Sequence, residues 1–409
     1  MKHLIFGFVL CSWVALAHEN SQVDARYLEK RKICQVNSEG YESVDDAPAI
    51  NAAIQKCGSA GTILLPVDQL YSIRSPIDLS PCRRCEIQLE GQLWFSNDPA
   101  LFADKAAFIS IPGGDGVTLR SLTGEGVIDG RASTVYQRYR LDDPWKTAPP
   151  MINILNSSNV VIDNILAKNI IKRFYMIDGK SSNIHLKNLR LTVENQWWQE
   201  VWTRGESIGF HIRDSSSVTL ENINVDFQSD RSDNNVGICA GIDWGTNNIT
   251  VKNIYCRTGG GAMVQFGTGG PPNTIPPASQ QYATNILIQN YTANASDNAG
   301  FQNLAGYDDA YVRNYRYKDV NIFATNSPNY YRGRSLINDI CFVVNGTKTD
   351  KMCQEWTRNL HANFSDVWFT NFKGNVDLGL GMYGHKARTQ LDCGCARCYC
   401  DFHFEGWPA

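Results

Sequence analysis

Residues 206–243 gather acidic side chains around a single histidine. The candidate acidic residues in it are Glu206, Asp230, Asp233 and Asp243, and His211 lies among them. Carboxyl and imidazole groups transfer protons in general acid/base catalysis, and the separation of an acid from a base requires at least two such groups. The segment therefore predicts acid/base chemistry. A solvated loop position is the alternative for each carboxylate, because charged residues are usually exposed.

Aromatic and cationic side chains accompany these carboxylates: Trp197, Trp198, Trp202, Trp244, Arg213, Arg231 and Arg257. Indole rings stack well on the apolar faces of sugars, and guanidinium groups bind carboxylates. These residues are candidates for ligand contacts. Burial under a loop for the tryptophans, and an ordinary surface position for the arginines, are the alternatives.

Short repeats are the elements that must position these residues. Each repeat has a turn residue, then alternating apolar and polar residues, then Asn or Ser. The copies are 159–164, 183–188, 217–222, 248–253, 285–290 and 366–371, with weaker copies at 116–121 and 309–314. The closing asparagines 164, 188, 222, 253, 290 and 314 are 24, 34, 31, 37 and 24 residues apart.

Alternation with period two predicts that each repeat is a short strand with one buried face. A single repeat is too short to form a core, so the copies must stack, as they do in a parallel β-helix. We therefore expect an all-β, right-handed parallel β-helix from about residue 60 to 380 whose closing asparagines stack at the corners. An antiparallel sandwich is the alternative, but it predicts gaps of only about 8 to 12 residues.

The segment before the repeats predicts a cap for the solenoid. Residues 45–57 have the pattern of a capped amphipathic helix, and residues 61–66 that of a strand. A terminal helix covers the open end of a stacked core. We expect a single domain over residues 18–409 with a Cys-rich tail at 393–400.

The composition excludes several classes of protein. Of 409 residues, 43% are hydrophobic and 19% are charged, with a net charge of −3. This is a globular composition, and without a long basic run it does not favour nucleic-acid binding. No cofactor, metal site or membrane partner is predicted, and we expect a monomer.

The N-terminus has the pattern of a secretory signal peptide. Lys2 and His3 precede an apolar run, and Ala15-Leu16-Ala17 places small residues where a signal peptidase cleaves. A membrane anchor is the alternative, but the run is shorter than the roughly 20 residues that span a bilayer. We therefore expect removal of residues 1–17 and an extracellular protein.

The cysteines agree with secretion. Without Cys11 the chain keeps an even number, and disulfides are expected in an oxidising compartment. Local pairs are available at Cys82/Cys85, Cys239/Cys256 and Cys341/Cys353, although connectivity stays open. The tail cysteines 393, 395, 398 and 400 fit a zinc site less well than two disulfides. Glycosylation is predicted at the Asn-x-Ser/Thr sites Asn156, Asn248, Asn290, Asn294, Asn345 and Asn363.

The chain resembles the polygalacturonase family of glycoside hydrolases, most closely its fungal exo-acting and rhamnogalacturonase-like members. The resemblance is carried by Asp46-x-Pro48-Ala49-Ile50, by residues 61–66, by the Gly124–Gly130 segment Gly-Glu-Gly-Val-Ile-Asp-Gly, and by the stacked repeats. It implies a right-handed β-helix with a cleft along one side. It also implies hydrolysis with inversion, in which an acid protonates the leaving oxygen while a base activates water.

The motifs that carry catalysis in that family are altered here. Its Asn-Thr-Asp-Gly corresponds to residues 206–209, which keep Gly209 but have Ile208 in place of the aspartate. Its Asp-Asp pair falls on Asp233 and Asn234, its Gly-His-Gly on residues 259–261, and its Arg-x-Lys uronate clamp on residues 301–303, which include Gln302 and Asn303. The resemblance implies Asp233 as the acid, and leaves Glu206, Asp230 and Asp243 as substitute bases.

These observations predict a secreted protein of the polygalacturonase type that hydrolyses pectin-like or other wall polysaccharide with a rearranged acid/base pair. Candidate substrate contacts are Asn234, Gln302, Asn303, Trp197, Trp198, Trp244, Arg213 and Arg257. Two alternatives remain. One is an inactive binding or decoy protein, and the other is a cleft recruited for lyase or isomerase chemistry.

Overall fold

The computed structural model describes residues 32–102, 104–132, 148–170, 172–196, 207–229, 237–257, 260–264, 277–294, 311–323, 337–338, 363–375, 390–391 and 399–406. The chain from Lys32 onward forms one compact unit. The expected signal peptide, Asn345, Cys341 and Cys353 lie outside the described residues. The domain boundaries therefore stay a prediction.

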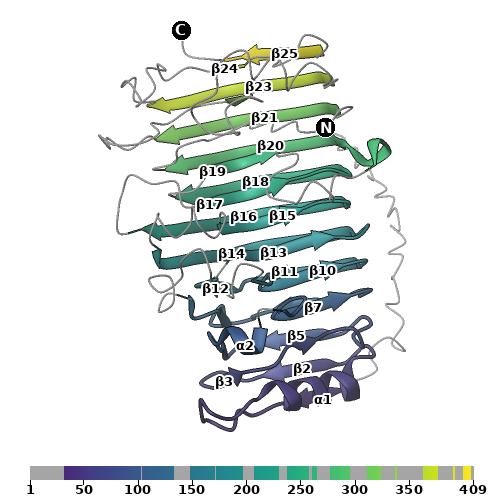
Figure 1. Ribbon diagram of the computed structural model, residues 1–409, viewed down its shortest axis with the longest axis vertical. Coiled ribbons are helices and arrows are strands. Elements are labelled where there is room, and N and C mark those ends of the chain that lie inside the picture. The colour runs from purple at the N-terminus through teal and green to yellow at the C-terminus, as the bar shows by residue number, and fades with distance from the viewer. Residues whose placement is uncertain are drawn as a thin grey trace, which may run out of the picture. The chain divides into compact units, whose positions relative to one another are not determined.

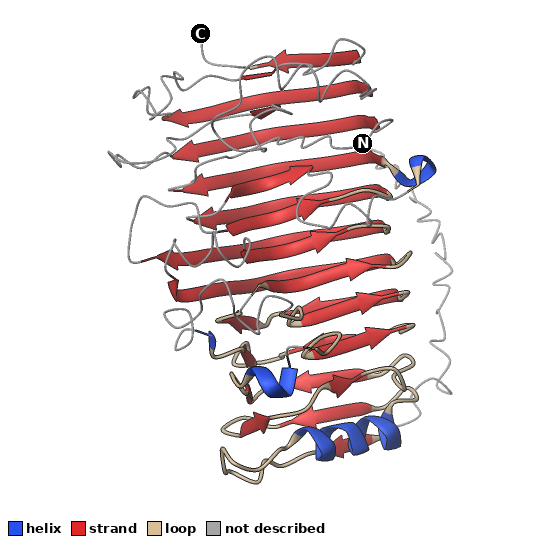
Figure 2. Cartoon of the chain, in the orientation of Figure 1, coloured by secondary structure: helices blue, strands red, loops and turns tan. Residues whose placement is uncertain are grey.

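Parallel strands make up nearly all of the regular secondary structure in the described chain (Figures 1 and 2). One sheet has the order β1 (Ile33–Gln35), β2 (Thr62–Leu65), β5 (Glu86–Leu89), β8 (Thr118–Arg120), β11 (Ser158–Asp163), β14 (Ser182–Gln196), β16 (Ser216–Ser229), β18 (Thr246–Arg257), β20 (Tyr282–Asn294), β21 (Tyr311–Phe323), β23 (Asn363–Asn375) and β25 (Tyr399–Glu405). The strands β3 (Leu70–Ile73), β6 (Gln92–Phe95), β9 (Val127–Asp129) and β12 (Leu166–Lys168) extend it at the N-terminal coils.

A second sheet lies on the coils between Ile77 and Val264. Its order is β19 (Gly260–Val264), β17 (Gly237–Ile242), β15 (Ser207–Ile212), β13 (Arg173–Asp178), β10 (Ile152–Leu155), β7 (Ile109–Pro112) and β4 (Ile77–Asp78). A short pair joins β22 (Ile337–Asn338) and β24 (Gln390–Leu391). The described helices are α1 (Ala47–Cys57), α2 (Pro99–Phe102) and a 3-10 turn at Ala278–Gln280.

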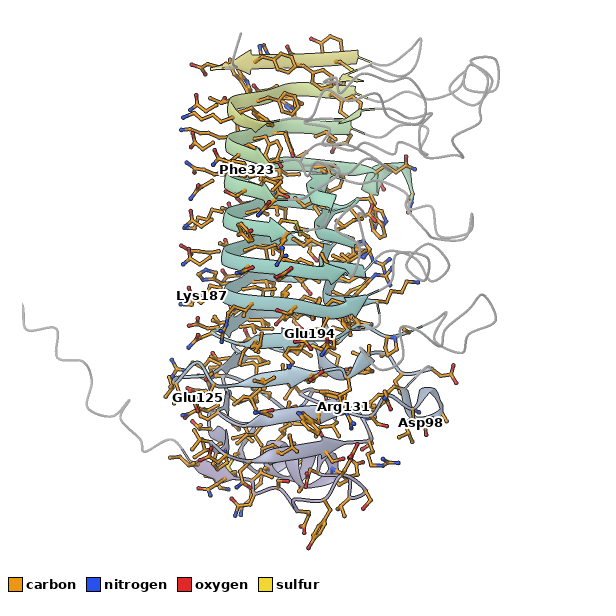
Figure 3. The ribbon with its side chains drawn as sticks, turned by 90° about the vertical axis from the view of Figure 1, so that its left-hand side faces the viewer. Asp98, Glu125, Arg131, Lys187, Glu194 and Phe323 are labelled. Carbon is orange, nitrogen blue, oxygen red and sulfur yellow. A yellow bond between two sulfur atoms is a disulfide. The ribbon has the colours of Figure 1, made fainter. Side chains whose placement is uncertain are left out.

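The stacked repeats form the core that the alternation predicts. Ile184 pairs with Val218, and Val218 pairs with Ile249 on the next coil. Val218 and Leu220 are fully buried, as expected for inward positions. Polar side chains such as that of Lys187 project from the outer surface (Figure 3). The all-β parallel β-helix is confirmed, because each coil buries apolar side chains that no single repeat can cover.

Two rows of residues in the left-handed backbone region bend the long strands. The closing asparagines 188, 222, 253 and 290 all have φ between 52° and 56°. Each side-chain amide donates a hydrogen bond one coil back: Asn222 to Asn188 at 3.1 Å, Asn253 to Asn222 at 2.9 Å, and Asn290 to Asn253 at 2.8 Å. Asparagine suits these corners because it tolerates a positive φ and offers both a donor and an acceptor.

Asn314 was expected to close a repeat, and this assignment is wrong. Arg313 pairs with Thr284 and Tyr315 with Ile286, so Asn314 lies opposite Asn285 in the row that opens the repeats. Its amide donates to the Asn285 side-chain oxygen at 2.7 Å. Asp319 closes this repeat instead. The pattern misled because both rows use asparagine and because Tyr315 and Tyr317 replace the usual aliphatic residues.

Helix α1 packs against the first coil, as expected for a cap. Ile50 and Ile54 are buried on the side that contacts β1, β2, β3 and β4. Asp46 occupies the N-cap position, but its carboxylate accepts hydrogen bonds from Glu39 and Ser72 main-chain N–H groups rather than from the helix. Asp45 binds the Ala47 N–H instead, at 3.1 Å. No helix in the described ranges has the length and apolar character needed to span a bilayer.

Disulfides join Cys82 to Cys85 and Cys239 to Cys256, as the spacing suggested. A third, between Cys34 and Cys57, ties β1 to α1 and was not foreseen. Cys400 is disulfide-bonded as well.

Among the predicted glycosylation sites, Asn156, Asn248, Asn290 and Asn363 are exposed and Asn294 is partly buried. Exposure is compatible with modification, which stays a prediction.

Candidate active site

Four neighbouring strands place one residue each on a line across the second sheet: Arg173, Ile208, Ile238 and Gly260. Phe174 and Tyr175 are consecutive in β13 and both fully buried, so the alternation of this strand slips by one residue. Ile177 returns to the core. Arg173 before the slip and Met176 after it therefore face away from the core.

The slip recurs in β15 and has a steric cause. A Cβ atom on Gly209 would lie 2.5 Å from the Cys239 carbonyl oxygen and 3.4 Å from Cδ1 of Leu191 in the core. No side chain fits there, so glycine is required, and Phe210 takes the next inward position. The close contact explains why this chain has the glycine of the family motif at Gly209, and why Ile208 before it faces outward.

Ile208 and Ile238 occupy the outward line and contact one another. They form an apolar pair separate from the main core, 9% and 3% exposed. Ile208 stands where the resemblance places an aspartate. Ile238 lies on the line between Ile208 and Gly260, and Asp233 precedes it in the chain, outside the described residues. An apolar pair cannot exchange protons, so acid/base groups must come from other positions.

His211 and Asp243 provide such groups on the same outer face. His211 lies between the inward residues Phe210 and Ile212, so its ring faces away from the core. Its Nε2 is 3.3 Å from Asp243 Oδ2, and the two side chains are only 9% and 8% exposed. Asp243 Oδ1 accepts the Trp244 main-chain N–H at 2.8 Å. Within the described residues, His211 Nδ1 is buried without a hydrogen-bond partner.

This arrangement can hold and move a proton. With its proton on Nε2, the imidazole donates to Asp243 and leaves Nδ1 as a free acceptor. A carboxylate that orients a histidine also stabilises the imidazolium formed when the histidine takes a second proton. The pair is therefore a candidate for the base that activates water.

Arg213 and Trp244 lie beside this pair. Arg213 is held by Asp178, with Nη2 and Nε at 2.6 and 2.7 Å from Oδ2, and its guanidinium lies 5.8 Å from the Trp244 ring centroid. Arg213 is therefore already committed to a carboxylate. Trp244 is partly buried against the core, so one of its two expected roles, packing, is observed directly.

The other expected site residues are placed elsewhere or are not described. Arg257 ends β18 on the first sheet and binds Asp226 at 3.1 Å. Outside the described residues lie Glu206, Asp230, Asp233, Asn234, Gln302, Asn303, Trp197 and Trp198. Their roles stay predictions.

Sequence reasoning missed two cations at the start of β13. Burial lowers the pKa of Lys172, with a further contribution from Arg173. Burial also lowers the pKa of Arg173; the Arg213 charge adds to this and Asp243 opposes it. The signal available in the sequence was the basic pair Lys172-Arg173 directly before the aromatic pair Phe174-Tyr175. Two consecutive buried aromatic residues break the strict alternation of inward and outward side chains. Among the described residues, no three His, Cys, Asp or Glu side chains form a metal-binding group.

Comparison with known proteins identifies the family. The model of glycosyl hydrolases family 28 matches residues 58–323. A probable endo-xylogalacturonan hydrolase A of Aspergillus fumigatus is 30% identical over 323 residues, covering 78% of this chain and 74% of that protein. Endo-xylogalacturonan hydrolase A of Aspergillus tubingensis is 30% identical over 353 residues, covering 85% and 79%.

A solved structure shares the fold. The crystal structure of endo-xylogalacturonan hydrolase from Aspergillus tubingensis superposes with a TM-score of 0.71 at 24% identity, over 92% of each chain. These relatives are named as endo-acting xylogalacturonan hydrolases rather than as exo-acting or rhamnogalacturonase-type enzymes. The polygalacturonase-type family expected from the motifs is nevertheless confirmed, and the chain belongs to glycosyl hydrolases family 28.

Proposed function

We propose that this protein hydrolyses glycosidic bonds in a pectic polysaccharide, with xylogalacturonan as the first substrate to test. The observation that carries the proposal is the buried His211–Asp243 pair on the outer face of the second sheet. It supplies a proton acceptor on the same strand as Ile208, the position where the family motif has lost its aspartate. The names of the relatives support the substrate class.

The proposed reaction uses two separated groups. Asp233, on the segment that leads into β17, gives its proton to the leaving oxygen while the bond from that oxygen to the anomeric carbon breaks. Water attacks the opposite face of the sugar, and its proton passes to His211 Nδ1, whose imidazolium Asp243 stabilises. Inverting hydrolysis of this kind places the acid and the base about 6.5 to 9.5 Å apart, which leaves room for the water.

A substrate panel tests the activity. The purified protein is incubated with xylogalacturonan, homogalacturonan, rhamnogalacturonan and a neutral glucan, and new reducing ends are identified by mass spectrometry. We expect release from xylogalacturonan above all, and weak release from homogalacturonan because the family's uronate clamp is replaced at residues 301–303. The absence of new reducing ends from every pectic substrate would refute the hydrolase.

Asp233→Asn tests the assigned acid. Loss of a general acid typically costs about 10²- to 10⁴-fold in rate, with little effect on the fold. Near-normal turnover in this variant would show that the acid lies elsewhere.

A polysaccharide-binding protein without turnover is the second candidate. It is favoured by the Ile208–Ile238 contact, which fills the outward line with apolar side chains. Calorimetric titration separates the two functions, because a binding protein gives a saturable signal with xylogalacturonan oligosaccharides and no new reducing ends. The hydrolase gives both.

We also propose that the protein acts outside the cell as a monomer. The signal-peptide pattern of residues 1–17 supports secretion, as do the three disulfides within the described residues. Detection of the mature N-terminus in the culture medium, together with the mass measured by light scattering, tests both statements.

A further inference from the structure

Arg173 stands on the outward line of the second sheet, beside Ile208. It pairs with Ile208 in the backbone ladder, and the slip at Phe174 and Tyr175 turns it away from the core. Its Nε is buried, and no hydrogen-bond partner for that atom exists among the described residues. Arg213 differs, because Asp178 occupies its guanidinium.

A buried donor without a hydrogen-bond acceptor is costly, and native proteins keep few of them. Burial and the Arg213 charge lower the pKa of Arg173, and the Asp243 carboxylate opposes them. Lys172 adds a second charge beside it, and burial lowers its pKa too. An anionic ligand on this face would offset the two positive charges and give Arg173 Nε an acceptor.

We propose that Arg173 binds the carboxylate of a galacturonosyl unit on the outer face of the second sheet. This inference rests on the proposed function for its substrate class. It gives this face a uronate contact from β13, whereas the family clamp position carries Gln302 and Asn303. A guanidinium donates two parallel hydrogen bonds to a carboxylate, and the neighbouring Ile208 offers an apolar surface to the sugar ring.

Binding to matched oligosaccharides tests the contact. Trigalacturonate and its carboxyl-reduced counterpart are titrated calorimetrically into the wild type, Arg173→Gln and Arg190→Gln, with mass spectrometry of the products after each titration. Arg190 is the matched control, since it lies on β14 and donates to the Gly124 carbonyl at 3.3 Å. We expect the wild type and the control to prefer the acidic trimer about 10- to 100-fold, as a charged bidentate contact predicts, and Arg173→Gln to lose this preference.

Stability provides a second readout, because a purely structural arginine would behave differently. Arg173→Met removes a partly buried charge whose Nε has no acceptor among the described residues, so its urea midpoint should equal or exceed that of the wild type. A lower midpoint would overturn the inference. So would an unchanged preference for the acidic trimer in Arg173→Gln.

The outcomes also separate this inference from the proposed function. Charge-dependent binding that requires Arg173, together with no new reducing ends from any pectic substrate of the panel, supports the uronate contact and refutes the hydrolase. Hydrolysis with an unchanged preference in Arg173→Gln refutes the contact alone.

Discussion

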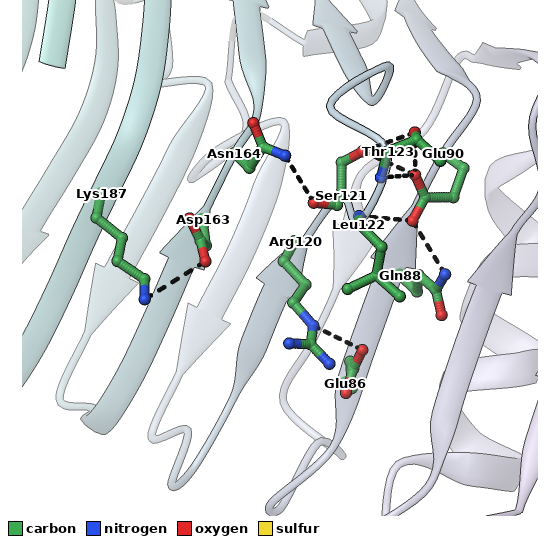
Figure 4. Close-up of polar contacts among 10 residues, drawn as sticks. All are labelled: Glu86, Gln88, Glu90, Arg120, Ser121, Leu122, Thr123, Asp163, Asn164 and Lys187. Atoms are coloured by element: carbon green, nitrogen blue, oxygen red, sulfur yellow. Dashed lines mark hydrogen bonds and ion pairs between the residues drawn. The ribbon is translucent and has the colours of Figure 1, made fainter. Parts of the chain in front are cut away.

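Glu90→Gln perturbs a buried carboxylate that holds the corner between β5 and β6. The side chain accepts hydrogen bonds from the Leu122 and Thr123 main-chain N–H groups, at 2.7 and 3.1 Å, and from the Ser121 hydroxyl at 2.8 Å (Figure 4). The Thr123 hydroxyl donates as well. Glutamine keeps the size of the side chain, but it removes the charge and turns an N–H₂ group toward donors.

The magnitude follows from the pKa of Glu90. Burial by itself raises this pKa, but the hydrogen bonds from Thr123, Leu122 and Ser121 together outweigh it and lower the pKa from 4.5 to about 2. A pKa that is lower in the folded state stabilises the protein above pH 4.5, and this stability is lost as the pH falls toward 2. A pKa lowered to this extent corresponds to about 3 kcal/mol of folding free energy.

Urea unfolding followed by far-UV circular dichroism measures this effect at pH 7, 4 and 3. We expect Glu90→Gln to be less stable than the wild type by about 2–3 kcal/mol at pH 7, and the difference to shrink steadily below pH 4.5. Glu125→Gln is the matched control, because Glu125 is exposed on the turn between β8 and β9 to which Glu90 binds. A difference that is equal at pH 7 and pH 3, or as large in the control, would refute the reasoning.

The remaining predictions concern the fold and the support of the site. Asn222→Ala should lower the free energy of unfolding by about 2 kcal/mol, because it removes two ladder hydrogen bonds and keeps a φ of 55° that alanine tolerates poorly. Asn222→Gly should cost about 1 kcal/mol less, because glycine adopts this φ without strain. Equal urea midpoints for the two variants would contradict a contribution from the backbone conformation. Gly209→Ala should lower the free energy of unfolding by about 3 kcal/mol, because the added Cβ would collide with the Cys239 carbonyl oxygen. A melting temperature equal to that of the wild type would show that the backbone shifts to accommodate the methyl group. The double variant Cys239→Ala/Cys256→Ala should lower the free energy of unfolding by about 3 kcal/mol, because it removes a disulfide between residues 17 positions apart. A urea midpoint equal to that of the wild type under oxidising conditions would contradict this.

The coil architecture was readable from the sequence because one corner residue marks each copy. Asn188, Asn222 and Asn253 form the hydrogen-bonded row that their spacing predicted. The same signal failed at Asn314, since both corner rows use asparagine and only strand register distinguishes them.

The candidate site was readable only in part. His211 and Asp243 were singled out as acid/base candidates. They are 32 residues apart in the sequence, and the register between β15 and β17 brings them together. Arg173 was missed, because its outward direction depends on a slip in alternation that a strict period of two does not predict. Glu206 and Asp233 stay predictions from the motif.

The rate of xylogalacturonan hydrolysis by Asp243→Asn, compared with that of Asp163→Asn, tests the central claim most directly. Asp163 is the matched control, because it lies on β11 and faces Lys187 at 3.5 Å on the other sheet. The account predicts that Asp243→Asn lowers kcat about 10²- to 10⁴-fold while calorimetric binding of the substrate persists, and that Asp163→Asn retains wild-type turnover. Equal rates in the two variants would contradict the role assigned to the His211–Asp243 pair.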